Sequence, residues 1–389
     1  MRIIRVYVGV CIVLMGAVLD LSYTYSLNNL RPTEFMNYIS NISSRVNKEL
    51  DSKLLSMLRE ALGKSKVKRR LSDNNVFKLR AYLLPRDVFV ISPKGLLMNV
   101  FTVSNSAITI RSDSLGIFLR LGSLNFSRTF VAYGEIPLKY LTGRLKIEAK
   151  TILPPILSSE CVEDPRLDPE IPTELYHVRA YYMSGAMRSL VITFHSRIKY
   201  GVNYVRINSL EPVTFDYEGV EYLLQDYRDT FPLSNKVMLV RPWIKDAGIG
   251  GIFAGFREGS KVNFKSLRPI PELLPNLEFE LKTGANASLK ISSNEYLILF
   301  HSVERIHGTY YTYAALFSND GEILGITTEP ILQPQPSIYS GRRPSTIFVC
   351  GAVRLKDKIV ISAGKDDEIL LIMEADINDI LSKMKYVRG

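Results

Sequence analysis

The sequence predicts an all-β fold for most of its 389 residues, preceded by an N-terminal membrane segment and a helical stem. Three observations lead to this prediction. From about Asp87 onward, short runs rich in Val, Ile, Tyr, Phe and Thr alternate with clusters of Gly, Pro, Asn, Asp and Ser, as expected of strands joined by turns. Before them, leucines recur at helical spacing. The first residues combine arginines with an unbroken apolar run, the pattern of an export signal or anchor.

The composition is that of an ordered globular protein. Hydrophobic residues make up 46% and charged residues 23%, which excludes the low-hydrophobicity signature of disorder. Three cysteines allow at most one disulfide bond, and four histidines show no metal-ligand spacing, so we expect neither a disulfide scaffold nor a metal site. The net charge of +10 comes partly from a basic run at residues 64–70, which we expect to be solvated surface. We therefore predict no nucleic-acid partner.

The N-terminal segment, residues 1–27, is predicted to be a signal anchor or a signal peptide. Arg2 and Arg5 precede an apolar run over Val6–Leu19, whose 14 residues are few for a spanning helix of about 20. Because such arginines stay inside, we expect the rest of the chain on the extracytoplasmic side, anchored in the membrane or secreted if the segment is cleaved. Three Asn-x-Ser sequons agree with export, namely Asn41, Asn125 and Asn286.

Residues 28–80 are predicted to form a helical stem that carries the basic run. Apolar residues spaced by three and four positions indicate an amphipathic helix, which Gly63 ends. We expect its apolar face to pack on the main domain, on a second copy of the chain or on the membrane surface, so an oligomer formed through this helix is one alternative. The spaced residues are Val46, Leu50, Leu54, Leu55, Leu58 and Leu62.

Residues 81–389 are predicted to form one β domain. The strands come in groups separated by longer loops, and no clean repeat of fixed period is visible. The length accommodates five blades of a β-propeller, while a sandwich or a barrel is the alternative. The clearest predicted strands are Val88–Ile91, Ala107–Ile110, Gly116–Leu121, Ser189–His195, Lys236–Val240, Tyr296–Ser302, Thr309–Phe317, Ser345–Cys350 and Lys358–Ala363.

Four segments of this domain carry candidate functional residues. Each is a weak signal alone. Asp164 and Arg166 alone suggest an ion pair on a turn, and a histidine at a strand end, such as His301, is more often structural than a ligand contact. The four segments are Cys161–Arg166, Arg228–Trp243, Glu295–Val303 and Ser345–Glu368.

In this order and at these separations, the segments resemble glycoside hydrolase family 130 and related β-mannoside phosphorylases and mannosyltransferases. The resemblance covers about residues 100–382, and Glu163–Arg166 matches the Glu-Asp-Pro-Arg motif of the family. The other matching positions are Phe231-Pro232, Arg241-Pro242, Tyr296–Val303, Tyr310–Ala315, Phe348–Gly351 and Ala363–Asp366, with Asn105 and Arg120 as counterparts of an early Asn and a strand Arg. The resemblance implies a five-bladed β-propeller that acts on β-linked mannosides.

The resemblance also implies roles for individual residues. Asp164 takes the role of proton donor to the leaving glycosidic oxygen in an inverting mechanism, with the proton passing through a sugar hydroxyl. In a phosphorylase, inorganic phosphate attacks and needs a basic cradle. The candidates for that cradle are Arg166, Arg228, Arg241 and His301. Asp366 takes the role of holding hydroxyls of the mannose ring. The predicted substrate-binding set also includes Asn105, Arg120, Glu163 and Asp229.

Three tyrosines offer aromatic faces for stacking on a sugar ring, although strand core is an equally good interpretation. They are Tyr181, Tyr310 and Tyr311.

Departures from the family pattern leave the reaction open. Ser302 follows the histidine where the family has Gly, and no Glu stands near Ile338. Around Met183, where phosphorylases often place a phosphate-binding arginine, only Arg179 and Arg188 are found. Both the base of a hydrolase and the phosphate cradle of a phosphorylase are therefore incomplete in the sequence.

The expected function is that of a carbohydrate-active enzyme that cleaves or transfers β-linked mannosyl units. We expect a mannoside phosphorylase or hydrolase with no cofactor, and with inorganic phosphate as co-substrate in the phosphorylase case. The alternatives are a related mannosyltransferase and a non-catalytic, glycan-binding propeller at the cell surface. An enzyme requires the candidate residues to converge at one mouth of the central channel, whereas a binding module permits them to be scattered.

Overall fold

The structure, a computed structural model, describes residues 37, 40–92, 95, 97–123, 128–157, 160–181, 190–201, 205–244, 247–335 and 341–387. The predicted N-terminal membrane segment and the sequon at Asn125 lie outside these residues, so membrane anchoring stays a prediction. Among the described residues, no helix is both long enough and apolar enough to cross a membrane.

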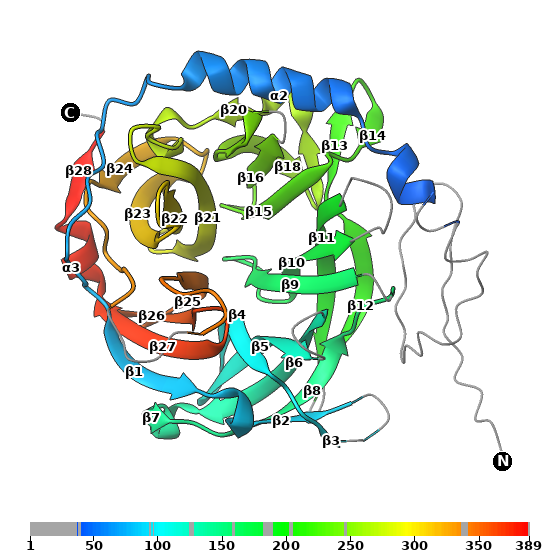
Figure 1. The fold of residues 1–389 in the computed structure, drawn as a ribbon, viewed down its shortest axis with the longest axis vertical. Helices are drawn as coiled ribbons and strands as arrows, with labels where there is room; N and C mark the ends of the chain where they lie inside the picture. The colour runs from blue at the N-terminus through cyan, green and yellow to red at the C-terminus, as the bar shows by residue number, and fades with distance from the viewer. Residues whose placement is uncertain are drawn as a thin grey trace.

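The described residues form mostly antiparallel β-structure, in sheets that lie around a common centre (Figure 1). The first sheet contains, from the centre outward, β4 (Thr102–Arg111), β5 (Ser114–Ser123), β6 (Arg128–Pro137), β8 (Ile147–Leu153), β2 (Val88–Ile91) and β3 (Leu97–Met98). The second contains β9 (Glu160–Leu167), β10 (Glu174–Tyr181), β11 (Leu190–Tyr200) and β12 (Val205–Pro212). The third contains β15 (Asp226–Pro232), β16 (Val237–Ile244), β18 (Phe253–Glu258) and β20 (Arg268–Pro269).

Two further sheets complete the ring. The fourth contains β21 (Glu280–Lys290), β22 (Glu295–Glu304), β23 (Tyr310–Ser318), β24 (Ile323–Thr327) and β28 (Met384–Tyr386). The fifth contains β25 (Ile347–Leu355), β26 (Lys358–Lys365), β27 (Ile369–Asp376), β1 (Lys78–Leu83) and β7 (Gly143–Arg144). The central strands β4, β9, β15, β21 and β25 lie next to one another.

Short elements connect these sheets. The strands β13 (Thr214–Tyr217), β14 (Val220–Tyr222) and β19 (Lys261–Asn263) form a small side sheet, and β17 (Ile249–Gly250) pairs with both β16 and β21. The short helices are η2 (Pro85–Asp87), η3 (Leu138–Tyr140), η5 (Phe264–Ser266), η6 (Pro271–Leu273) and α3 (Ile377–Leu381).

The all-β prediction is confirmed. The predicted strand at 88–91 coincides with β2, and those at 296–302 and 358–363 lie within β22 and β26. These segments are rich in β-branched and aromatic residues, whose side chains pack well on a pleated sheet. The apolar side chains of the sheets face one another and form the core, so the local pattern was sufficient to find the strands.

Both ends of the described chain are built into the sheets. β1 pairs antiparallel with β27, and Arg80 Nη1 contacts Glu374 Oε2 at 2.7 Å across 294 positions of sequence. The C-terminal strand β28 in turn pairs with β24. The predicted boundary between stem and β domain, at residue 81, thus falls inside β1, and the ring is closed by strands from both ends.

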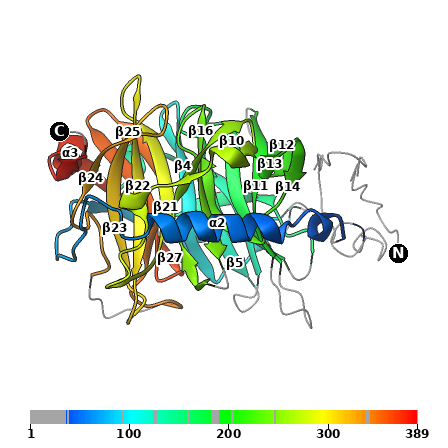
Figure 2. The same ribbon diagram turned by 90° about the horizontal axis from the view of Figure 1, so that it is seen from above.

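The predicted amphipathic helix is α2 (Lys48–Ala61), which lies along the side of the sheets (Figure 2). Asn47 caps its N-terminus by accepting a hydrogen bond from the backbone two residues on, at 2.9 Å. Leu50, Leu54 and Leu58 are fully buried in the core cluster that includes β16, and burial of each stabilises the fold by about 1.5–3 kcal/mol. Of the three predicted partners for this face, the structure shows the main domain.

The basic run contains one residue whose predicted surface location is wrong. The side chain of Arg69 is only 5% exposed, pairs with Glu280 and donates to the carbonyl oxygens of Glu272 and Leu274. The run is extended here, so alternate side chains point to opposite sides, and Val67 is buried as well. The other cations of the run are exposed, namely Lys64, Lys66, Lys68 and Arg70.

Candidate active site

The five central strands share one irregularity, a β-bulge near the middle of the ring. In each, the pairing with the next strand slips, so that an extra residue is accommodated on the central strand. Bulges re-aim a side chain that regular pleating would place elsewhere. The polar or thiol residues at the bulges are Asn105 in β4, Asp164 in β9, Asp229 in β15, Asn286 in β21 and Cys350 in β25. All of them are buried.

The backbone at three of these bulges is left-handed. φ is +31° at Asn105, +49° at Asp164 and +54° at Asp229. Among non-glycine residues, Asn and Asp tolerate this region best because their short polar side chains bond locally. The local sequence is therefore suited to the geometry that brings these side chains together.

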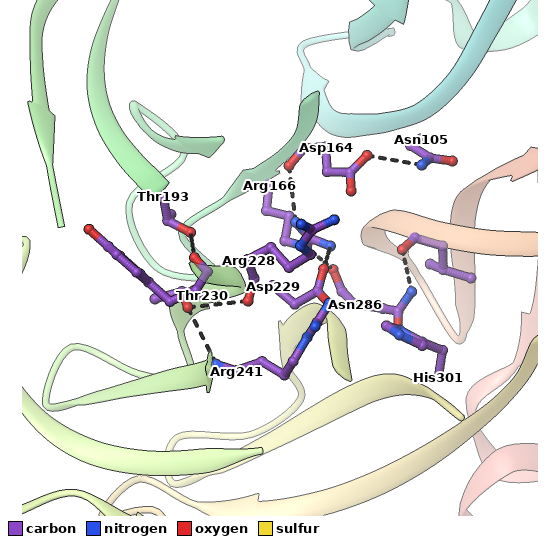
Figure 3. Close-up of polar contacts among 12 residues, drawn as sticks. Asn105, Asp164, Arg166, Thr193, Arg228, Asp229, Thr230, Arg241, Asn286 and His301 are labelled. Atoms are coloured by element: carbon purple, nitrogen blue, oxygen red, sulfur yellow. Dashed lines mark hydrogen bonds and ion pairs between the residues drawn. The ribbon is translucent and has the colours of Figure 1, made fainter. Parts of the chain in front are cut away.

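Asp229 is the centre of the polar network (Figure 3). Its Oδ1 accepts a hydrogen bond from Arg166 Nη2 at 2.6 Å, and its Oδ2 accepts from Arg241 Nη2 at 2.7 Å. All three side chains are almost fully buried. Burial alone raises the pKa of Asp229, but Arg241 and Arg166 outweigh it and hold the pKa of the carboxyl well below its usual range. The network thus carries one carboxylate for two guanidinium groups.

Asn286 and His301 lie beside this network. Asn286 Nδ2 donates to the carbonyl oxygen of Val349 at 2.7 Å, so its Oδ1 is left to accept from His301 Nδ1 at 2.8 Å. Burial and the neighbouring cations hold the pKa of His301 well below its usual range, so the imidazole is neutral at pH 7. With the proton on Nδ1, His301 Nε2 is an acceptor, and it is buried without a hydrogen-bond partner in the described part of the chain.

The same contacts correct one detail of the sequence analysis. The sequon residue Asn286 is fully buried and its amide nitrogen is engaged, so it is not an acceptor for glycosylation in the folded chain. The sequon did not reveal the burial of Asn286, because a sequon is defined by three neighbouring residues and contains no information on burial.

Gly284 lies against the side chains of both His301 and Asp229. A Cβ at this position would lie 2.5 Å from His301 Cε1 and 2.6 Å from Asp229 Oδ2. We therefore expect Gly284→Ala to push the two side chains apart, with a loss of about 1–3 kcal/mol in unfolding free energy and loss of turnover. Chemical unfolding measures the first effect. Gly325→Ala is the control, since its new Cβ meets nothing closer than 3.5 Å, and equal losses in both variants would contradict the interpretation.

Asp164 faces a second cluster on the other side of Arg166. Its Oδ1 accepts from Arg120 Nη1 at 2.7 Å and from Asn105 Nδ2 at 2.9 Å, while Arg120 Nη2 contacts Glu163 Oε1 at 3.1 Å. The backbone carbonyl of Asp164 accepts from Arg166 Nη1 at 3.1 Å. That bond joins this cluster to the Asp229 network.

Asp366, predicted to hold sugar hydroxyls, is bound by groups of the protein close to its own turn. Its carboxyl pairs with Lys365 and accepts from the backbone N–H groups of Thr346 and Gly341 at 3.3 and 3.4 Å. The neighbouring carboxylate, Asp367, is the one that faces Arg120, at 4.0 Å from Nη1. Both residues have φ of +55°, so the turn after β26 sends successive side chains in different directions.

Further cationic side chains lie close to Arg241. Arg228 pairs with Asp226 at 3.0 Å and is partly exposed. Lys282 forms no ion pair among the described residues, and its Nζ lies 5.6 Å from the ring centre of Tyr310. Arg343 lies 4.8 Å from the same ring. Burial, with the charges of Arg241, Arg228 and Arg343, lowers the pKa of Lys282 to about 7.

The structure brings most predicted site residues together. Four further residues belong to the same neighbourhood and were missed, namely Asn286, Lys282, Arg343 and Asp367. Of the predicted stacking tyrosines, Tyr181 is buried in the core and Tyr310 packs against His301, which leaves Tyr311 partly exposed. The residues brought together are Asn105, Arg120, Glu163, Asp164, Arg166, Arg228, Asp229, Arg241 and His301.

A sequence signal for Asn286 does exist. A polar residue or cysteine followed by a small residue recurs in the central strands, and 59 positions separate Asn105 from Asp164, with similar intervals to the later bulges. The pairs are Asn105-Ser106, Asp164-Pro165, Asp229-Thr230, Asn286-Ala287 and Cys350-Gly351. Two-residue matches at loosely fixed intervals are too weak to stand out before the strands are placed.

Known proteins resemble this chain in sequence pattern and in fold. The family model of glycoside hydrolase family 130, described as beta-1,4-mannooligosaccharide phosphorylase, matches residues 67–386. The solved β-1,2-mannobiose phosphorylase from Listeria innocua is similar in fold, with a TM-score of 0.59 and 14% identity over 82% of this chain and 99% of its own. MPT-4, a mannose phosphorylase from Leishmania mexicana solved with a phosphate ion, has a TM-score of 0.50 and 12% identity over 78% of this chain and 92% of its own.

No curated protein sequence matches the chain. The family model, however, spans all five bulged central strands and the polar network that they carry. The predicted resemblance is thus confirmed, and the chain belongs to glycoside hydrolase family 130.

Proposed function

We propose that the protein is an inverting phosphorylase of β-linked mannosides, with Asp164 as the general acid. The observation that carries the choice of phosphorylase over hydrolase is the excess of cations beside the Asp229 network. Asp229 is already shared by Arg166 and Arg241, and Lys282 and Arg343 add positive charge around Tyr310 without a carboxylate partner in the described residues. Such an unbalanced cluster favours an anion in the site.

The cradle of this proposal differs from the one expected from the sequence. Arg166 and Arg241 are held by Asp229, and the free nitrogen of His301 is an acceptor, so these three groups are better suited to shape the site and to accept a hydroxyl. The cations that remain for phosphate are Lys282, Arg343 and Arg228. Of these, Arg228 would have to share its charge between phosphate and Asp226.

In the proposed reaction, Asp164 supplies a proton to the glycosidic oxygen through a sugar hydroxyl as the bond to the anomeric carbon breaks. A phosphate oxygen forms the new bond on the opposite face of the ring. The products are a mannose 1-phosphate of inverted configuration and the shortened saccharide. Phosphate is already an anion, so no general base is needed, in agreement with the missing Glu near residue 338.

The direct test is to incubate the full chain with β-1,2- and β-1,4-mannobiose, with and without inorganic phosphate. Mannose 1-phosphate formed only with phosphate supports the proposal. Free mannose formed at the same rate without phosphate would identify a hydrolase instead. Binding of mannobiose with neither product would identify a non-catalytic glycan-binding member of the family.

Anion binding should depend on pH through Lys282. Its pKa of about 7 in the free protein means that the ammonium group is largely deprotonated at pH 8 to 9, and a bound dianion must restore the proton. Sulfate is a suitable probe because it does not titrate in this range. We expect its affinity, measured by calorimetry, to fall roughly tenfold per pH unit above pH 7.

Two variants separate the titration of Lys282 from that of other groups that could change the sulfate affinity with pH. Lys282→Arg keeps a permanent charge, so its sulfate affinity should stay constant between pH 7 and 9. Lys282→Met should bind sulfate weakly at every pH. A wild-type affinity that does not change up to pH 9 would refute the assignment of Lys282 to the cradle.

We also propose that the five sheets are the blades of a β-propeller. Support comes from the five central strands, which carry equivalent bulges and lie next to one another in Figure 1. A crystal structure with these strands around one channel would agree with the proposal, and a sandwich of two packed sheets would contradict it.

A further inference from the structure

Trp243, the only tryptophan of the chain, lies beside the cations of the candidate active site. It stands on β16, two residues after Arg241, and pairs with Gly250 of β17. Gly250 in turn pairs with Lys282 of β21. Because residues directly opposite each other on paired strands have their side chains on the same face, Trp243 and Lys282 share one face of the sheet with only a glycine between them.

Gly250 leaves room for the indole ring. A Cβ at this position would lie 3.0 Å from Trp243 Cε3 and 3.1 Å from Arg241 Cδ, so both side chains pass close over the glycine. Lys282 Nζ lies 5.9 Å from the centre of the Trp243 ring and 5.6 Å from the centre of the Tyr310 ring. Both distances are within the reach of a cation–π interaction, about 6 Å.

The other groups around Lys282 are mostly repulsive. Among the residues that the structure describes, no carboxylate forms an ion pair with Lys282, and the nearby carboxylate of Asp229 is already shared by two arginines. His301, which faces the same cations, is neutral. The repelling cations are Arg241, Arg228 and Arg343.

The two rings differ from a carboxylate partner in one respect. A carboxylate would neutralise the ammonium group and compete with an incoming anion. An aromatic ring attracts the ammonium through its quadrupole and carries no net charge, so the positive charge is held in place and is not cancelled. The same attraction is absent for the neutral amine, so the rings favour the protonated form of Lys282 against burial and the arginines.

We propose that Trp243 is a positioning residue that, together with Tyr310, holds the ammonium group of Lys282 against two aromatic rings and keeps its full charge available to an anion. The proposal rests on the proposed function, in which Lys282 belongs to the phosphate cradle. It gives Trp243 a role that the sequence motifs did not assign.

The first experiment measures sulfate affinity by calorimetry between pH 5.5 and 9. In Trp243→Leu, loss of the indole should lower the pKa of Lys282 by about one pH unit. Sulfate affinity should then change little at pH 5.5, fall about fivefold at pH 7 and fall about tenfold above pH 8. Trp243→Phe keeps an aromatic face and should recover most of the lost affinity.

Two controls distinguish this role from a structural one. In a Lys282→Arg background the charge is permanent, so adding Trp243→Leu should leave the sulfate affinity independent of pH. Tyr140→Leu removes an equivalent contact outside the site, where Lys139 Nζ lies 4.9 Å from the ring centre, and should behave as wild type. A loss of affinity in Trp243→Leu that is equal at every pH, with a lowered melting temperature, would mean that the indole only supports the fold and would overturn the proposal.

The second experiment needs no ligand. Because Trp243 is the only tryptophan, the tryptophan emission of the full chain reports on the charge beside this ring. We expect the wild-type emission to titrate with a midpoint near pH 7 and the emission of Lys282→Met to stay constant in this range. A constant wild-type emission between pH 5.5 and 9 would refute the contact between Trp243 and Lys282.

The two experiments also separate this proposal from the proposed function. If the wild type binds sulfate but turns over no mannoside with phosphate, the phosphorylase reaction fails and the pH profiles of the variants still decide the role of Trp243. If the wild type binds no sulfate at any pH, the anion site fails, and the emission titration alone decides whether Trp243 holds Lys282.

Discussion

Asp164→Asn is expected to lower mannoside turnover by about 10²–10⁴-fold while the fold stays intact. The leaving oxygen of a mannoside needs protonation in the transition state, and an amide cannot supply that proton. The fold should survive because Arg120 keeps Glu163 at 3.1 Å and Asp367 at 4.0 Å as counter-charges. The amide oxygen can still accept from Asn105, so sugar binding should change little.

The measurement is kcat and KM on mannobiose with phosphate, together with the melting temperature. We expect the loss to appear in kcat with KM nearly unchanged, because the interaction is made in the transition state. Glu163→Gln is the control, since it removes another carboxylate from the same guanidinium group without removing the proposed acid. Normal melting and binding with wild-type turnover in Asp164→Asn would end the catalytic assignment.

Asp229→Asn should have the largest effect on stability. Removal of the charge leaves Arg166 and Arg241, both 2–3% exposed at the side chain, without their carboxylate. Breaking a buried ion pair by neutralising one partner costs roughly 3–5 kcal/mol, because the remaining charge is uncompensated. Urea unfolding at pH 7 measures this loss. We expect turnover to fall as well, since Arg166 and Arg241 are positioned by the same carboxylate.

Two comparisons make this prediction specific. Asp320→Asn breaks the exposed pair with Lys236 and should cost at most about 1 kcal/mol. The pKa of Asp229 is lower in the folded than in the unfolded state, so its carboxylate stabilises the fold above about pH 4, and this contribution is lost as the pH falls toward the folded pKa. The difference between wild type and Asp229→Asn should therefore be smaller at pH 3 than at pH 7. Equal effects of the Asp229 and Asp320 variants would contradict the central role of Asp229.

The local pattern of the sequence was sufficient for the strands, for α2 and for the family. Strand periodicity and helix periodicity are set by side chains a few positions apart, and Leu50, Leu54 and Leu58 mark the buried face of α2 without knowledge of its partner. Motifs such as Glu163–Arg166 are likewise contiguous, so their resemblance to the family was visible before any fold was known.

The state of each charged side chain was decided by the tertiary structure, because it depends on partners that are far away in sequence. Arg69 looks like part of a solvated run until Glu280, 211 positions later, is placed against it. Arg166 and Arg241 look like phosphate ligands until Asp229 pairs with both. The pKa of Lys282 is lowered only once the fold buries it and brings Arg241, Arg228 and Arg343 close to it. A sequence specifies which residues can carry charge, but burial and the balance of neighbouring charges exist only after the central strands converge.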